Sequence, residues 1–202
     1  MSDQKALSIK LAHIYYHTGS WEKAILEYEK ITGLDPNDWG VRYTLGECYM
    51  KKGDLEKAYK EFEASANGFM REKNVKKASG SYREMANIIQ KLFEPQDVTK
   101  AKDMYRDIIS RLPDAEDAIR NLRDLFQRHN EIEDAVRYTI RLGDLYNKMD
   151  YIDKAENEYL KVMAMDPGNA AVQQKILQLR EEMSRLEEPG DDLPPPAAPG
   201  LI

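Results

Sequence analysis

The first candidates for chemistry are two histidines, His13 and His17, which stand one helical turn apart. Two imidazoles at this spacing lie on one face of a helix and can ligate one metal ion, as in the zinc-protease motif. The residues between them are Ile14, Tyr15 and Tyr16, so the general-base glutamate of that motif is absent. No carboxylate or thiol cluster nearby supplies further ligands. We expect a structural or peptide-contact role for both histidines and no bound metal; a metal-sensing or catalytic domain built around them is the alternative.

The sequence also lacks the patterns that other catalytic or cofactor sites require. It has no glycine-rich phosphate loop, no nucleophile elbow and no Cys-x-x-Cys pair. The single cysteine, Cys48, cannot form an internal disulfide, which is typical of a reducing compartment, and its place in an amphipathic segment predicts a small packing residue. We therefore predict a protein that is not an enzyme, has no cofactor, lies in the cytoplasm and has no membrane-spanning segment.

Charge is unevenly distributed along the chain. The net charge is −6, and residues 187–202 carry four acidic side chains with no Lys or Arg. The remaining body is nearly neutral, whereas a nucleic-acid surface needs clustered positive charge. The one basic stretch, Arg71 to Lys91, has its charges at helical spacing and is expected to be a solvated face. We predict protein partners rather than nucleic acid or membrane.

The elements that position these residues repeat along the chain. Sliding the sequence 77 residues along itself superimposes Lys23 on Lys100 and Tyr28 on Tyr105. It also superimposes three alanines on three others, namely Ala24, Ala58 and Ala78 on Ala101, Ala135 and Ala155. Self-similarity at a fixed period is the sequence signature of stacked repeat architectures. Such arrays present an extended surface for binding.

Helical periodicity dominates between regularly spaced turn signals, and strand alternation is absent. Short connections of this kind make neighbouring helices antiparallel. We predict an all-α fold of about ten antiparallel helices over residues 4–18, 20–34, 37–52, 54–72, 75–93, 97–112, 114–129, 131–148, 151–165 and 169–187.

Several of these segments share a residue pattern. One begins at Leu11-Ala12 and runs through Tyr15, Gly19, Ala24 and Tyr28 to Asp35-Pro36; Leu45-Gly46 and Leu142-Gly143 begin others. The pattern resembles the tetratricopeptide repeat, a helix-turn-helix unit of 34 residues. The resemblance implies a right-handed α-solenoid. We expect repeats over residues 1–168 in two related halves, about 20–89 and 97–166.

The resemblance has departures. The 20-residue gaps between some of the alanines imply that helices 54–72 and 131–148 each serve twice, as second helix of one unit and first helix of the next. The leading tryptophan of the family is missing, because Trp21 and Trp39 lie outside that position.

The C-terminal part of the chain differs from the repeats. The last helix, 169–187, carries an apolar stripe at Val172, Ile176, Leu179, Met183 and Leu186. We interpret it as a capping helix that covers the end of the core; pairing of the stripe with a second copy is the alternative. Residues 188–202 are acidic and proline-rich, and we expect a disordered tail. A functional role of that tail is a further alternative.

In the resembled family the first helix of each pair lines a concave groove that binds peptides. Carried over by position, the resemblance gives a candidate peptide-binding groove of His13, Tyr16, Tyr43, Glu47, Met50, Asn67, Met70, Arg71, Arg120, Asp124, Gln127, Asp144, Asn147 and Lys148. We predict a protein–protein interaction scaffold or adaptor that holds a peptide or helix of another protein there. A self-assembling structural protein, joined through the solenoid ends or helix 169–187, is the alternative.

Overall fold

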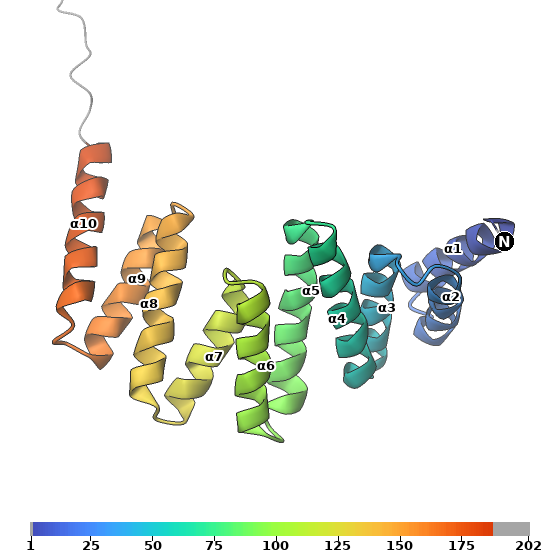
Figure 1. Ribbon diagram of the computed structural model, residues 1–202, viewed down its shortest axis with the longest axis horizontal. Coiled ribbons are helices and arrows are strands. Elements are labelled where there is room, and N and C mark those ends of the chain that lie inside the picture. Colours follow the sequence, from blue (N-terminus) through green and yellow to red (C-terminus); the bar gives the residue numbers. More distant parts are fainter. Residues whose placement is uncertain (1, 188–202) are drawn as a thin grey trace, which may run out of the picture. The chain divides into compact units, whose positions relative to one another are not determined.

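The computed structural model describes residues 2–187 and is built from helices throughout that range (Figure 1). It contains ten α-helices, one short π-helix and no strand among those residues, which confirms the predicted all-α fold. The elements are α1 (Ser2–His17), α2 (Trp21–Leu34), α3 (Trp39–Lys52), α4 (Leu55–Arg71), α5 (Val75–Ile88), the π-helix η1 (Ile89–Phe93), α6 (Val98–Arg111), α7 (Glu116–Arg128), α8 (Ile132–Lys148), α9 (Ile152–Met165) and α10 (Ala170–Glu187). The helix predicted over 75–93 is therefore divided between α5 and η1.

The internal duplication is visible in the helix boundaries. Helices α6, α7, α8 and α9 begin 77 residues after α2, α3, α4 and α5, respectively. The left-handed turn residues follow the same offset, because Gly53 corresponds to Asn130 and Lys73 to Asp150, all with positive φ. One block of helices and turns thus occurs twice in succession.

Side chains fix where several helices begin. In α3, α4, α5 and α6 the residue before the helix accepts a hydrogen bond from the backbone N–H three positions later, at distances from 2.9 to 3.2 Å. Such caps satisfy one of the otherwise unpaired N–H groups of the first turn. The capping residues are Asp38, Asp54, Asn74 and Asp97.

Small residues let the helices approach closely. All six repeated alanines are fully buried. Gly46 lies against the ring of Phe62, and Gly143 lies against the ring of Tyr159; a Cβ at either glycine would come within about 3.1 Å of three ring atoms. Contacts of this kind give the close packing of a protein interior.

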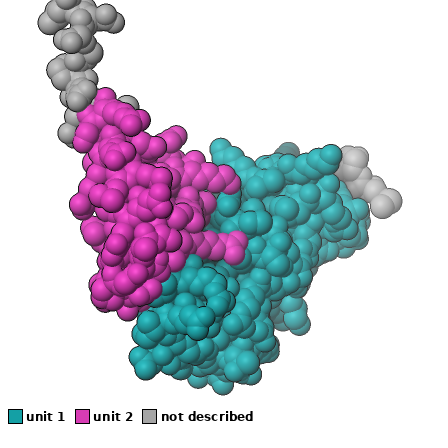
Figure 2. Space-filling view, turned by 60° about the vertical axis from the view of Figure 1, so that its left-hand side comes forward, with its two compact units in different colours: residues 1–138 teal, residues 139–202 magenta. Residues whose placement is uncertain are grey.

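The chain divides into two compact units, residues 1–138 and 139–202, shown in Figure 2. The core of the first unit contains one large side chain from each of α2 to α6: Tyr28, Leu45, Phe62, Tyr82 and Tyr105. The core of the second unit contains Leu142, Tyr159, Val162, Val172 and Leu179.

The apolar stripe of α10 is buried inside the second unit. Val172, Ile176 and Leu179 are each less than 9% exposed, and α10 packs against α9. Met183 is half-buried, and the role of α10 as a cap stays a prediction. The predicted tail, 188–202, lies outside the described residues. No helix within 2–187 combines the length and the apolar character that crossing a bilayer requires.

Candidate partner-binding surface

The predicted groove residues of α1 and α3 meet in the first unit. The hydroxyl of Tyr16 donates a hydrogen bond to Oε2 of Glu47 at 3.2 Å, and both side chains are partly buried. Burial, together with the negative charge of Glu47, raises the pKa of Tyr16. Burial and the nearby charge of Glu84 raise the pKa of the Glu47 carboxyl, against the hydrogen bond from Tyr16. His13 is exposed on the preceding turn of α1.

Tyr43 extends this surface from α3 to α5. Its ring packs edge-on against Phe62, with ring centroids 5.2 Å apart. On its other side it lies beside Gly80 of α5, where a Cβ would be 3.9 Å from the ring. Burial and the charges of Glu47 and Glu84 raise the pKa of Tyr43. The tyrosine therefore connects three helices at one partly exposed position.

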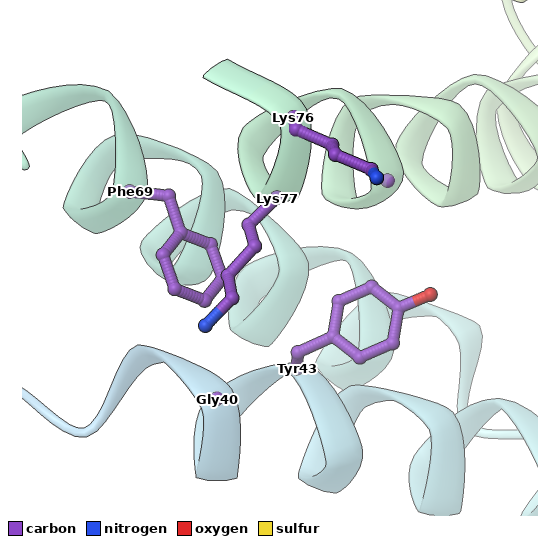
Figure 3. Close-up of a pocket in the computed structure, with 6 residues that line it drawn as sticks. Gly40, Tyr43, Phe69, Lys76 and Lys77 are labelled. Carbon is purple, nitrogen blue, oxygen red and sulfur yellow. The ribbon is translucent and has the colours of Figure 1, made fainter. Parts of the chain in front are cut away.

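A pocket opens next to Tyr43 (Figure 3). It has a volume of about 300 Å³ and lies between the first turns of α3 and α5 and the last turn of α4. Its lining is apolar except for two lysines, and Lys77 extends beside the ring of Phe69, with Nζ 5.3 Å from the ring centroid. The residues that line it are Gly40, Tyr43, Phe69, Lys76, Lys77 and Gly80.

The predicted groove residues of α4 are engaged elsewhere in the first unit. Oδ1 of Asn67 accepts a hydrogen bond from Nη1 of Arg111 in α6 at 2.8 Å. The guanidinium of Arg71 stacks over the indole of Trp39 at 5.1 Å. Within the described residues no hydrogen bond, ion pair or ring contact joins Asn67, Met70 or Arg71 to Tyr16 or Glu47.

On α7 the predicted residues interact within their own helix. Arg120 forms ion pairs with Glu116 and Asp117, the latter at 3.0 Å. Oδ1 of Asp124 accepts a hydrogen bond from Nε of Arg123 at 2.8 Å. Gln127, at the end of the helix, is exposed. Arg120 and Asp124 therefore offer charges that neighbours already partly neutralise.

In the second unit, Asp144 is exposed but its carboxylate is engaged by neighbouring helices. Its Oδ1 accepts hydrogen bonds from Tyr159 at 2.6 Å and from Nζ of Lys175 at 2.5 Å. Burial and these carboxylate interactions raise the pKa of Tyr159. Asn147 and Lys148 lie exposed one turn further along α8. Asp144 thus ties α8 to α9 and α10.

Comparison with known families identifies the repeats. Two family models, both described as tetratricopeptide repeat, match residues 19–78 and 136–169. These two stretches, together just under half of the chain, are tetratricopeptide repeats. The matches cover α2 to α4, with the start of α5, in one region and α8 with α9 in the other. This fold indicates a scaffold for protein–protein interaction.

Two solved structures have a similar fold. A crystal structure of MamA protein is 17% identical, with a TM-score of 0.54, and the alignment covers 93% of this chain and 97% of that one. A tetratricopeptide repeat protein from Parabacteroides merdae is 14% identical, with a TM-score of 0.53, and the alignment covers 91% and 75% of the two chains. No curated protein matches the sequence significantly.

The sequence patterns did not predict the part of this surface that α5 contributes. The lysines of the pocket, and Arg83 with Glu84 on the next turns of α5, fall in the stretch that the charge pattern assigns to a solvated face. Gly80 was the one indication of this site in the sequence, because a glycine inside a helix often has a packing reason. In the structure it lies beside the ring of Tyr43. Within 2–187 no three metal-ligating side chains cluster.

Proposed function

We propose that the protein is a non-catalytic adaptor that holds a peptide or helix of a partner protein on the α1–α3–α5 surface. We define this surface by Tyr16, Tyr43, Glu47, Gly80 and Glu84. Two contacts beside an open pocket carry the proposal. The hydroxyl of Tyr16 donates to Glu47, and Tyr43, one turn before Glu47 on α3, lies beside Gly80 of α5. Predicted groove residues from two separate helices thereby share one partly exposed site.

The side chains at this site are suited to binding rather than to chemistry. Tyr43 supplies a large apolar area with few rotatable bonds, so ordering it against a partner costs little entropy. Met50, half-buried two turns further along α3, adds an adaptable thioether. Partly exposed aromatic anchors of this kind dominate the free energy of many interfaces.

Alanine substitution of the two anchors tests this proposal. The Tyr43→Ala/Met50→Ala variant is expected to lose capture of partner proteins in an affinity pull-down, while its circular dichroism spectrum stays helical. The matched control is Met149→Ala/Tyr151→Ala, which removes the same residue types from an exposed position of the second unit. If the Tyr43→Ala/Met50→Ala variant captures partners as well as the parent protein does, the α1–α3–α5 surface is not the partner-binding site.

Self-assembly is a second candidate function, favoured by apolar side chains on the first and last helices. Leu7 and Ile14 of α1 are 58% and 57% exposed, and Leu177 of α10 is 60% exposed. Terminal repeats normally present polar outer faces, so such residues can join copies of the chain. Light scattering over a concentration series tests this candidate, which a constant monomer mass eliminates.

A further inference from the structure

The pocket beside Tyr43 is shaped by two glycines. Gly40 and Gly80 contribute no side chains, which leaves space beside the partly exposed ring of Tyr43; the buried ring of Phe69 forms the wall next to Lys77 (Figure 3). A Cβ at Gly80 would make only an ordinary van der Waals contact with Tyr43, so the space in front of it is open. A cavity of about 300 Å³ with apolar walls accepts one large apolar side chain.

One end of the pocket is positively charged. Lys76 and Lys77 are exposed on the first turn of α5, and neither forms an ion pair with a carboxylate within the described residues. The start of a helix adds partial positive charge at the same place. Asp38, near Gly40, is already engaged by the N–H of Val41 and by Lys5. This end therefore favours an acidic group.

The other end of the surface is negatively charged. Glu47 is half-buried, accepts a hydrogen bond from Tyr16, and has no cation within ion-pair distance among residues 2–187. Glu84, by contrast, is paired with Arg83 at 3.3 Å, and Lys51 lies one turn after Glu47 on α3. A carboxylate that is already partly desolvated and lacks a counter-ion gains more from an incoming cation than an exposed one does.

We propose that this surface binds an extended peptide segment that places a large apolar side chain between Tyr43 and Phe69, an acidic side chain at Lys76 and a Lys or Arg side chain at Glu47. Glu47 follows Tyr43 by four residues on α3, about 6 Å along the helix axis. An extended peptide advances about 3.3 Å per residue, so the basic residue stands about two positions from the apolar one. This inference rests on the proposed function and specifies the partner's chemistry.

Synthetic peptides test the charge order directly. The probe is acetyl-Asp-Gly-Phe-Gly-Lys-Gly-amide, in which the three side chains lie on one face of an extended chain, titrated into the full chain labelled with ¹⁵N. The backbone amides of Gly40 and Gly80 report on the pocket, because glycine amides fall in a separate region of the spectrum. Controls replace Phe by Ala, Lys by Asp, or Asp by Lys. We expect the Ala peptide to bind at least about tenfold more weakly, and each charge-reversed peptide about threefold to tenfold more weakly at low salt.

Protein variants localise the effect. Gly80→Leu fills the pocket and is expected to weaken binding of the Phe peptide at least about tenfold. The matched control is Gly33→Leu, because Gly33 is a helical glycine with open space in front of it. Glu47→Gln should remove the preference for Lys over Asp without changing the preference for Phe over Ala.

The outcomes separate this inference from the proposed function. Equal binding of all the Phe peptides, or shifts that spare Gly40 and Gly80, overturns the inference. Tighter binding of a peptide of residues 187–202 at the same amides also overturns it, because it assigns the pocket to the chain's own tail. Loss of partner capture in Tyr43→Ala/Met50→Ala would leave the proposed function in place in either case.

Discussion

The close approach of Trp39 to Gly68 makes a sharp prediction about stability. A Cβ built at Gly68 would lie within 2.5 Å of three atoms of the Trp39 indole. Trp39 cannot move away freely, because its indole Nε1 donates a hydrogen bond to Glu72 at 2.9 Å. Its backbone carbonyl also accepts a hydrogen bond from the hydroxyl of Ser65 at 2.9 Å. Gly68→Ala therefore creates an overpacked contact, which costs about 1–3 kcal/mol.

The same substitution also has a favourable part. Alanine is better than glycine in a helix interior by about 1 kcal/mol, which leaves a net loss of about 0–2 kcal/mol for Gly68→Ala. Because all three indole atoms would lie within 2.5 Å of the Cβ, we expect the upper end of that range, about 2 kcal/mol. Gly33→Ala serves as the control, because Gly33 is also helical but has nothing within 4 Å of a Cβ. Only the helix-propensity gain applies there, and we expect stabilisation by about 0.5–1 kcal/mol.

Urea denaturation measures both variants. Trp21 and Trp39 both lie in the first unit, so tryptophan fluorescence reports the unfolding of that unit. The urea midpoint should fall for Gly68→Ala and rise for Gly33→Ala at an unchanged slope. In a Trp39→Phe background the cost of Gly68→Ala should shrink, because the smaller ring relieves the contact. A Gly68→Ala protein as stable as the parent would refute the packing argument.

Three further predictions concern the first unit. Burial raises the folded pKa of Glu47 above its ordinary 4.5, so ionisation opposes folding as the pH rises through that range; Glu47→Gln should stabilise the protein at pH 7, and urea midpoints should show the gain disappearing towards pH 4. Burial raises the pKa of Cys48 to about 12, so a thiol reagent at pH 8 should modify the native protein far more slowly than the urea-unfolded one; equal rates would contradict its burial. Lys73 has a φ of 58°, so Lys73→Gly should stabilise the protein by about 1 kcal/mol and raise the urea midpoint, whereas Ser79→Gly at an exposed position inside α5 should lower the midpoint.

The fold was predictable from the sequence because local residue patterns that specify its helices recur along the chain. The offset of 77 residues between equivalent alanines is also the offset between the starts of α2 and α6 and between Gly53 and Asn130. Small residues such as Gly46 indicate close helix packing, since only they fit against a ring such as Phe62. These signals lie within a few residues of the structures that they specify.

The candidate site was less predictable, because it depends on pairs of residues far apart in the sequence. Transfer of family positions selected Tyr16, Tyr43 and Glu47, which the structure brings together with Gly80. It also selected Asn67, whose partner Arg111 is 44 residues away. The helical periodicity of the sequence does not predict which distant residue, such as Arg111, will pair with Asn67. Whether any of the predicted groove residues contacts a ligand stays a prediction.

The boundaries of the repeated block carry a consequence for the evolution and engineering of the chain. Residues 21–97 and 98–174 are consecutive segments of equal length, and the π-helix η1 with its following turn lies where the first gives way to the second. A copy of residues 98–174 inserted after Asp97 would keep the existing junction with residues 21–97 on its N-terminal side. Only the junction at its C-terminal end would be new, so the chain is a starting material for helical arrays of adjustable length.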